Sequence, residues 1–353
     1  MVPYFKQKPD YVAIPADFQP LPKYGHLSEK LPAWAAAEAA VDAMYAPSRS
    51  MPSYAACREL IGDPDAVMPP GGPDRYWAVT TELIRFPARD GYEVELKVYK
   101  SPDVKPDAVL VYRMHGGGWV IGRHEVDGAE NVYAATNKNI VVVSVDYRLA
   151  PENPFPCGLH DSYDGLLWCK QNAARLGINP EKIIISGSSA GGNLAACLTL
   201  ECREKSTTGI LAQVLHFPIT SHPKLFPKEQ YEFGSYVQNR DNPVINLLQM
   251  ESVWDAYVGT DPSRDQRHSP LLANSLEGLP PTLLQCAGCD VLRDDGFAYA
   301  EALRAAGVDV EVHGYAGLPH CFPAVVPTVE QTAVFYERYN GFLRKHAGGE
   351  ESR

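Results

Sequence analysis

Short apolar runs alternate with helical patterns over most of this chain, and this alternation restricts the possible folds more than any other feature. The runs lie at residues 108–112, 140–145, 182–186, 213–217, 282–287 and 308–315. Their length and lack of polar alternation are typical of strands that are buried on both faces. Helical patterns at residues 159–176, 192–204 and 296–306 separate several of them. The sequence therefore predicts an α/β fold, a mostly parallel central sheet with helices on both faces.

Two stretches of the chain fall outside this alternation. Residues 1–80 are rich in proline and contain two short helical patterns, and residues 225–259 interrupt the rhythm with a pattern that reads as helical. Just after the first stretch, polar and apolar residues alternate as in half-buried antiparallel strands, with an Asp90-Gly91 turn. We expect residues 1–80 to form an N-terminal cap segment and residues 221–260 a cap insertion. The main α/β domain then comprises residues 81–220 and 261–353.

A glycine-rich hexapeptide, Gly187-Ser188-Ser189-Ala190-Gly191-Gly192, follows an isoleucine-rich strand pattern and opens a helical one. A nucleophilic serine needs this strand–turn–helix setting, because the sharp turn projects its hydroxyl from the edge of the sheet. Small residues two positions on either side let strand and helix approach closely, and the helix N-terminus favours developing negative charge. Ser189 is therefore the predicted nucleophile. The alternative is a plain glycine-rich turn with a capping serine.

A run of three glycines, Gly116, Gly117 and Gly118, follows the strand pattern that precedes it in the chain. Acyl transfer passes through a tetrahedral oxyanion, which needs preorganised N–H donors. Consecutive glycines let the backbone turn such donors inward. We expect the oxyanion hole at these glycine N–H groups and at Ala190. A plain turn or a phosphate loop is the alternative, although no lysine follows as it does in Walker-type loops.

A serine nucleophile needs a base and a group that orients this base. In sheets of this kind the order along the chain is serine, acid, histidine, each at the C-terminal end of a strand. Asp290 comes soon after the penultimate apolar run and His320 after the last one, so they are the predicted acid and base. Asp294 is the rival acid, farther from its strand. His313 falls inside a strand pattern and is interpreted as structural.

Taken together, these motifs resemble the hormone-sensitive-lipase family of α/β-hydrolases over about residues 84–325. The resemblance implies an α/β-hydrolase fold with a helical cap, in which Ser189, Asp290 and His320 form the triad. It also implies an oxyanion hole that is lined by Gly116, Gly117 and Gly118, with Gly117 and Gly118 as the main donors, and by Ala190. Further segments similar to the family are Asp146-Tyr147-Arg148-Leu149-Ala150-Pro151-Glu152, Ser269-Pro270-Leu271, Leu279-Pro280-Pro281, and Asn242-Pro243 leading to Trp254 and Tyr257.

Three positions depart from the family pattern. Ser188 stands where an acidic residue usually precedes the nucleophile, and Val291 stands where a proline commonly follows the aspartate. Cys321 stands where a glycine commonly follows the histidine. None of these departures removes a triad group, so they bear on pocket shape and loop geometry.

Composition and charge narrow the range of partners. The chain has 353 residues and a formal net charge of −11, and it lacks the basic stripe that binds nucleic acid. No apolar run is long enough to span a membrane, and the N-terminus lacks a signal-peptide core, so a cytoplasmic protein is expected. The eight scattered cysteines then read as reduced, buried thiols. Cys286-x-x-Cys289 lacks the second half of a zinc site, so no metal is expected.

The predicted function is hydrolysis of carboxylic esters by a serine esterase that uses no metal or organic cofactor. His320 takes the proton of Ser189 as its oxygen attacks the acyl carbon, while Asp290 holds the imidazole tautomer. The expected partner is a small-molecule ester with a short acyl chain, because aromatic residues of both cap stretches suit a closed pocket. The sequence leaves a homodimer open. The alternatives are an acyltransferase or lyase on the same scaffold, or a non-catalytic small-molecule receptor.

Overall fold

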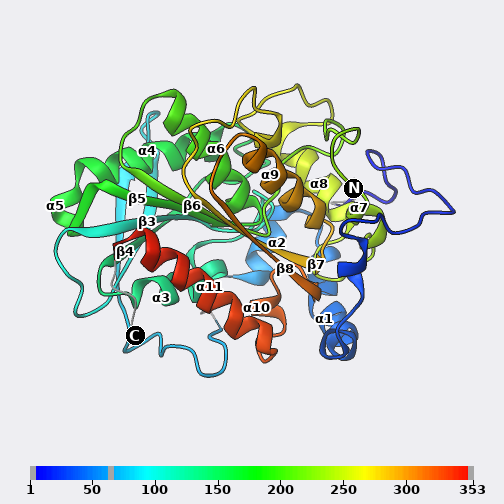
Figure 1. Ribbon diagram of the computed structural model, residues 1–353, viewed down its shortest axis with the longest axis horizontal. Helices are drawn as coiled ribbons and strands as arrows, with labels where there is room; N and C mark the ends of the chain where they lie inside the picture. Colours follow the sequence, from blue (N-terminus) through cyan, green and yellow to red (C-terminus); the bar gives the residue numbers. More distant parts are fainter. Residues whose placement is uncertain (1–4, 63–66, 349–353) are drawn as a thin grey trace.

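An eight-stranded sheet forms the centre of the computed structural model, which describes residues 5–62 and 67–348 (Figure 1). The strands are β1 Thr80–Pro87, β2 Glu93–Lys100, β3 Ala108–Met114, β4 Ile140–Asp146, β5 Ile178–Ser188, β6 Ile210–His216, β7 Thr282–Cys289 and β8 Val310–Pro319. Their order in the sheet is β1-β2-β4-β3-β5-β6-β7-β8. β2 pairs antiparallel with β1 and β4, and all other neighbours are parallel. The predicted mostly parallel α/β sheet is confirmed, and the antiparallel strands form its β1 edge.

Helices cover both faces of the sheet (Figure 1). They are α1 Pro32–Arg49, α2 Tyr54–Ile61, α3 Gly128–Ala135, α4 Cys157–Gln171, α5 Ala173–Leu176, α6 Ala190–Glu204, α7 Ser235–Gln238, α8 Leu247–Val258, α9 Arg293–Ala305, α10 Phe322–Val325 and α11 Glu330–His346, with 3-10 turns at Gly25–Ser28, His124–Asp127 and Pro270–Leu272. Ile183 and Ile185 of β5 face a core built with α4, α6 and α9. Ile184 between them faces a second core built with α3 and α11. Because successive strand residues point to opposite faces, the central strands are apolar throughout.

Two predicted helical stretches differ from the structure. The helix expected at residues 159–176 is interrupted at Asn172, whose side chain donates a hydrogen bond to the carbonyl of Trp168 and competes with the helical backbone. The stretch at 225–259 contains only α7 and α8, because Pro227, Gly234 and Pro243 prevent a continuous helix. Helices α3 and α11 were not predicted from the sequence.

The cap segments, defined here as residues 5–62 and 221–260, lie beside the ends of β7 and β8 (Figure 1). They contact each other directly. The backbone N–H of Lys23 donates to Glu232 Oε1 at 2.7 Å, and Gln238 Nε2 donates to the carbonyl of Gly25 at 2.8 Å. The division into residues 1–80, 221–260 and a main domain stays a prediction, and residues 1–4 and 63–66 within it lie outside the described residues.

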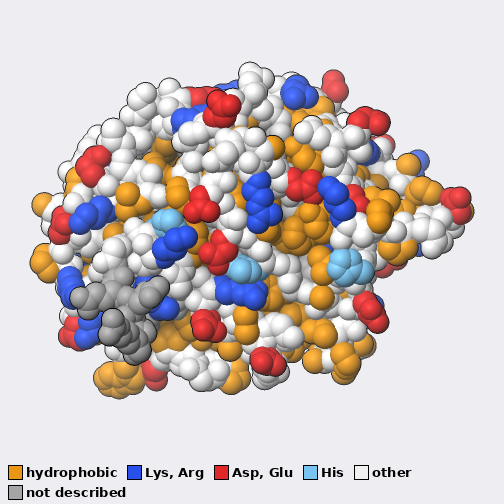
Figure 2. Space-filling view, viewed as in Figure 1, with side chains coloured by type: hydrophobic (Ala, Val, Ile, Leu, Met, Phe, Trp, Pro, Cys, Tyr) orange, Lys and Arg blue, Asp and Glu red, His pale blue; other side chains and the backbone are white. Residues whose placement is uncertain are grey.

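The molecular surface carries mixed charges on the face drawn in Figure 2, where acidic and basic side chains are interspersed. No helix among the described residues is both long and apolar enough to cross a membrane. All eight cysteines are free and six are buried, including Cys286 and Cys289. The expectation of reduced thiols that fill the core is therefore met by most of them.

Candidate active site

Ser189 lies at the junction of β5 and α6 in a backbone conformation that few side chains adopt, with φ +56° and ψ −119°. Residues other than glycine hold a positive φ only where the surrounding structure enforces it. A Cβ on Gly187 would lie 2.2 Å from the carbonyl oxygen of Gly191, and a Cβ on Gly191 would lie 2.0 Å from that of Met114. Both flanking positions therefore require glycine, as the close approach of strand and helix predicts.

Three side chains from the ends of three strands meet at this turn. His320 directly follows β8, and its Nε2 lies 3.0 Å from Ser189 Oγ while its Nδ1 lies 2.6 Å from Asp290 Oδ2. Asp290 directly follows β7, and its Oδ1 accepts the N–H of Leu292 at 2.9 Å. A proton on Nδ1, directed at the carboxylate, leaves Nε2 to accept the serine hydroxyl. The structure thus brings the predicted serine, histidine and aspartate into one hydrogen-bonded row.

The electrostatics of this row favour a charged imidazole. Burial by itself lowers the pKa of His320, but the negative charge of Asp290 and the hydrogen bond to it outweigh burial and hold this pKa well above 6.5. The neighbouring Cys321 acts in the same direction. An imidazolium formed at this position is therefore stabilised, which is what proton transfer from a serine requires.

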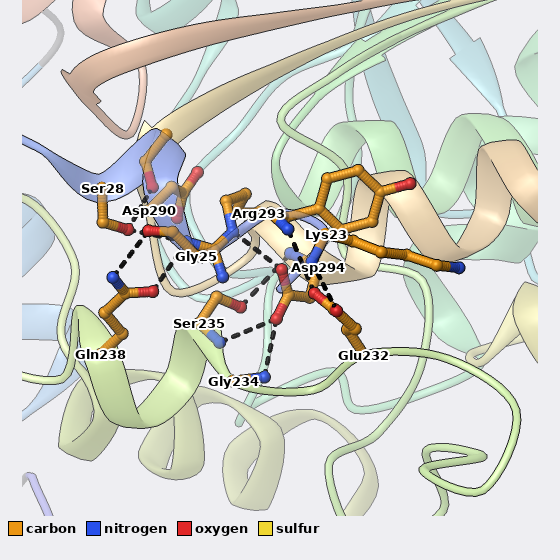
Figure 3. Close-up of polar contacts among 12 residues, drawn as sticks. Lys23, Gly25, Ser28, Glu232, Gly234, Ser235, Gln238, Asp290, Arg293 and Asp294 are labelled. Atoms are coloured by element: carbon orange, nitrogen blue, oxygen red, sulfur yellow. Dashed lines mark hydrogen bonds and ion pairs between the residues drawn. The ribbon is translucent and has the colours of Figure 1, made fainter. Parts of the chain in front are cut away.

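The rival acid and the rival histidine lie elsewhere. The carboxylate of Asp294 accepts the N–H groups of Gly234 at 2.7 Å and Ser235 at 2.8 Å, and Arg293 Nε at 2.8 Å (Figure 3). His313 pairs with a neighbouring glutamate on β8. Neither side chain has a contact with the serine, so only the first-choice acid and base are brought to it.

The three-glycine run passes beside Ser189. A Cβ on Gly116 would lie only 3.6 Å from the Cβ of this serine. Gly117 and Gly118 have φ values of +117° and +60°, in the region that favours glycine. In the described part of the chain, no carbonyl accepts a backbone hydrogen bond from the N–H of Gly117, Gly118 or Ala190. These three donors are available to an oxygen atom near the serine.

Helix α8, in the cap segment of residues 221–260, packs against the three-glycine run and the residue after it, Trp119. The ring of Trp119 stacks on Tyr257 with centroids 4.3 Å apart and contacts Trp254 at 4.7 Å. A Cβ on Gly118 would lie 3.0 Å from Val253. Ser189 is only 4% exposed beneath this cover. The serine is therefore enclosed rather than open to bulk solvent.

Two departures from the family pattern have structural reasons. Cys321 has φ +49°, a left-handed conformation in which glycine is less strained. Ser188 Oγ accepts a hydrogen bond at 3.2 Å from the buried Arg113, which also pairs with Asp127 at 3.0 Å. Because Asp127 already balances the charge of Arg113, the uncharged Ser188 leaves no buried charge without a partner.

One group of side chains among residues 5–62 and 67–348 has the composition of a metal site. The ligand atoms of Glu95, His124 and Asp146 lie within 4.8 Å of one another. Arg123 donates to both carboxylates at 3.2 Å, and Arg85 pairs with Glu95 as well, so two cations balance the two carboxylates. A divalent cation would have to displace these guanidinium groups, so we interpret the group as an ion-pair cluster.

The sequence analysis did not identify the residues that hold the acid in place. Arg293 contacts Ser28 and Gln238, which lie 265 and 55 residues away along the chain. No local pattern links such distant positions. The sequence signal was the group of charged residues after the strand, with Asp290 followed two apolar residues later by three consecutive charged residues, Arg293 to Asp295.

Comparison with known proteins identifies relatives of this chain. A family model described as an alpha/beta hydrolase fold matches residues 110–324. The carboxylesterase NlhH of Mycobacterium tuberculosis is 37% identical over 243 residues, which cover 66% of this chain and 74% of that protein. The versiconal hemiacetal acetate esterase of Dothistroma septosporum is 32% identical over 250 residues, which cover 69% and 75%.

Solved structures extend the likeness to nearly the whole chain. A thermostable esterase from Pseudomonas putida has a TM-score of 0.75 and 28% identity, covering 89% of this chain and 98% of that one. A vibralactone cyclase has a TM-score of 0.77 and 27% identity, covering 96% and 99%. These relatives confirm the resemblance to the hormone-sensitive-lipase family and the prediction of a serine hydrolase. The chain belongs to the α/β-hydrolase fold family.

Proposed function

We propose that this chain hydrolyses carboxylic esters of small molecules, with Ser189 as nucleophile, His320 as general base and Asp290 as the acid that orients the imidazole. The observation that carries the proposal is the unbroken row of contacts, 3.0 Å and 2.6 Å, at the ends of β5, β8 and β7. The relatives named carboxylesterase and esterase support it. No metal or organic cofactor takes part in the proposed reaction.

The first half of the proposed reaction forms an acyl-enzyme. As Ser189 Oγ attacks the acyl carbon, its proton moves to His320 Nε2, and Asp290 stabilises the resulting imidazolium. The carbonyl oxygen becomes an oxyanion, which accepts hydrogen bonds from the N–H groups of Gly117, Gly118 and Ala190. Each such donor is worth about 3 kcal/mol in the transition state. Collapse of the intermediate expels the alcohol, which takes the proton from the imidazolium.

The second half releases the acid. His320 removes a proton from water, and the hydroxide oxygen attacks the acyl carbon attached to Ser189 Oγ. The same N–H groups hold the second oxyanion. When this intermediate collapses, the imidazolium returns its proton to Ser189 Oγ, so the carboxylic acid leaves and the enzyme is regenerated.

A short acyl chain fits the enclosed setting of the serine. Val253, Trp254 and Tyr257 of α8 lie against Gly118 and Trp119. We expect this cover to limit the length of acyl chain that fits beside Ser189. We expect kcat/KM for p-nitrophenyl esters to be highest with acetate or butyrate and to fall for octanoate and longer chains. Peak activity on emulsified long-chain lipid would contradict this preference.

The decisive experiment labels and removes the nucleophile. An organophosphonate should modify Ser189, located by peptide mass spectrometry, and Ser189→Ala should fold normally and lose roughly 10³-fold or more in kcat. The matched control is the neighbouring serine: Ser188→Ala should keep most of its activity. If the two variants exchanged these behaviours, the nucleophile would be misplaced by one residue.

Product analysis separates hydrolysis from the alternatives. Because one matched structure is a vibralactone cyclase, the reaction mixture should be examined for free acid, for an acyl group transferred to an added alcohol, and for cyclised or eliminated product. Free acid in equal amount to the released alcohol is expected. A protein that binds esters but is never labelled at Ser189 would be a receptor.

A further inference from the structure

The strand end that carries Asp290 is held by side chains of both cap segments. Three consecutive carbonyl groups, at the end of β7 and directly after it, accept hydrogen bonds from cap side chains. The pairs are Ser28 Oγ with the carbonyl of Gly288 at 2.8 Å, Asn242 Nδ2 with that of Cys289 at 2.7 Å, and Asn239 Nδ2 with that of Asp290 at 2.9 Å. We call residues 288–294 the acid turn. Both cap segments therefore help to hold the backbone of this turn.

Arg293 joins the acid turn to both cap segments at once (Figure 3). Its side chain has no exposed surface. Nη1 donates to Ser28 Oγ of the first cap segment at 2.7 Å and to Gln238 Oε1 of the second at 2.9 Å. Nε donates to Asp294 Oδ1 at 2.8 Å. One buried cation therefore connects three parts of the chain.

Asp294 completes this connection. Its other carboxylate oxygen accepts the N–H groups of Gly234 and Ser235, which begin α7 (Figure 3). A buried ion pair is stable only when the remaining polar atoms of both groups are satisfied. Cap atoms bind Arg293 Nη1 and one oxygen of Asp294, whereas Arg293 Nη2 has no hydrogen-bond partner among the described residues. Removal of the cap would leave more polar atoms of this buried pair unsatisfied and would therefore destabilise it.

We propose that Arg293 is a positioning residue, which transmits the docking of both cap segments to Asp290 and so sets the hydrogen bond between Asp290 and His320. The path is short. The backbone N–H of Arg293 donates to the carbonyl of Asp290 at 3.2 Å, and that of Leu292 donates to Asp290 Oδ1 at 2.9 Å. The turn that Arg293 anchors is thus the one that orients the carboxylate. This inference rests on the proposed role of Asp290 as the acid.

The test replaces Arg293 by lysine. Lysine keeps a positive charge beside Asp294 but lacks the planar fork that reaches Ser28 and Gln238 together. We expect kcat to fall by about 10- to 100-fold, because a displacement near 1 Å in a reacting geometry has this effect. KM should stay within about threefold, because no ground-state contact with the ester is removed.

The pH profile distinguishes positioning from a purely structural role. Asp290 and Cys321 are the groups that raise the pKa of His320. When Asp290 moves away, the rising limb of kcat/KM should shift to lower pH in Arg293→Lys. A variant that merely folded less well would have fewer active molecules, but kcat/KM of those molecules would rise at the same pH as in the wild type. Titration of the labelled serine with phosphonate gives the number of competent sites, and kcat is expressed per labelled site.

Two further variants complete the design. Arg304→Lys is the matched control, because Arg304 lies on the same helix α9, is exposed, and its side chain donates a hydrogen bond to the carbonyl of Val310. Arg304→Lys should leave kcat and the rising limb of the pH profile of kcat/KM unchanged. Gln238→Met removes a hydrogen-bond acceptor of Arg293 by a change in the cap segment, and it keeps the buried ion pair between Arg293 and Asp294. This variant should lower kcat per labelled site and shift the rise of kcat/KM to lower pH, both by less than Arg293→Lys does. It replaces Arg293→Lys as the test if that variant does not fold.

The outcomes separate the two proposals. Wild-type kcat per labelled site and an unchanged limb in both Arg293→Lys and Gln238→Met would overturn the positioning role and leave the esterase proposal standing. A wild-type protein that is neither labelled at Ser189 nor active on any ester would overturn the proposed function and the positioning role with it.

Discussion

Replacing Gly117 by alanine tests the oxyanion loop through a clash whose size the structure gives. An added Cβ would lie 2.1 Å from the carbonyl oxygen of Ile121, whereas ordinary contacts of a Cβ begin at 3.4 Å. The loop must therefore open by 3.4 − 2.1 Å, which is 1.3 Å. Loss of one oxyanion donor costs about 10²- to 10³-fold in kcat, or about 3–4 kcal/mol. A shift larger than 1 Å removes most of that hydrogen bond, so we expect a loss of this order.

Backbone strain accompanies the clash and needs its own control. Gly117 has φ +117°, where an L side chain is strained, and left-handed conformations cost roughly 1–2 kcal/mol. Gly278→Ala provides the match, because Gly278 has φ +73° and nothing lies within 4 Å of an added Cβ. Gly278→Ala therefore measures the effect of backbone strain alone, without the clash and at a position far from Ser189 in the fold. Both variants should lose some stability, but only Gly117→Ala should lose kcat.

The assay combines steady-state kinetics on p-nitrophenyl acetate with thermal unfolding and phosphonate titration. KM should change little in Gly117→Ala, because oxyanion donors bind the transition state more strongly than the ester. The reasoning is refuted if kcat per labelled site stays within about threefold of wild type while Tm matches that of Gly278→Ala. In that case the N–H groups near residue 117 would not hold the oxyanion.

Three further predictions follow from the same geometry. Asp290→Asn should lower kcat by about 10⁴-fold through the wrong imidazole tautomer, whereas Asp294→Asn should affect Tm more than kcat; the reverse order would show that the acid is misassigned. Since Asp290 outweighs burial and holds the pKa of His320 well above 6.5, kcat/KM should rise with pH through that raised pKa. A rise of kcat/KM that is already complete below pH 6.5 would contradict this expectation. The pair of Asp290 and His320 stabilises the fold fully below pH 6.5, and this stabilisation is lost as pH rises through the raised pKa. Tm should therefore fall as pH increases across that range. Cys321 directly follows His320, so bulky thiol reagents that modify it should inhibit the wild-type protein by crowding the site. Cys321→Gly, at φ +49°, should keep activity, raise Tm slightly and abolish this inhibition. Cys157→Ala, at the other partly exposed cysteine, should remain sensitive to the reagents.

The strand–turn–helix setting of Ser189, the proposed nucleophile, could be predicted from sequence because all of its parts are contiguous in the chain. β5, the turn at Ser189 and α6 follow one another within a short segment, and the glycines at 187 and 191 mark the close approach. Hydrophobic patterning likewise placed Asp290 and His320 at strand ends. The parallel sheet then brings these ends together, since neighbouring parallel strands finish at the same edge.

The two candidate acids were ranked from the sequence by one criterion alone, the distance from the end of the strand. Asp290 directly follows β7, whereas Asp294 lies four residues farther on, and the structure adds the physical reason for their different environments. They differ because Arg293 and the N–H groups of Ser235 and Gly234 bind the carboxylate of Asp294. These partners depend on how a distant segment docks. The same holds for residues 225–259, whose apolar pattern reads as helical although its prolines confine helix to α7 and α8.

The hydrogen bond between Ser28 and Gly288 has a consequence for how the protein is made. The two residues are 260 positions apart, so at about 5–20 residues per second the ribosome delivers the second roughly 13–52 s after the first. Throughout this interval the N-terminal cap segment has no strand end to dock against. Side chains that end up buried, Trp34 and Tyr54 among them, meet water in the nascent chain. We therefore expect this cap segment to need chaperone protection during translation.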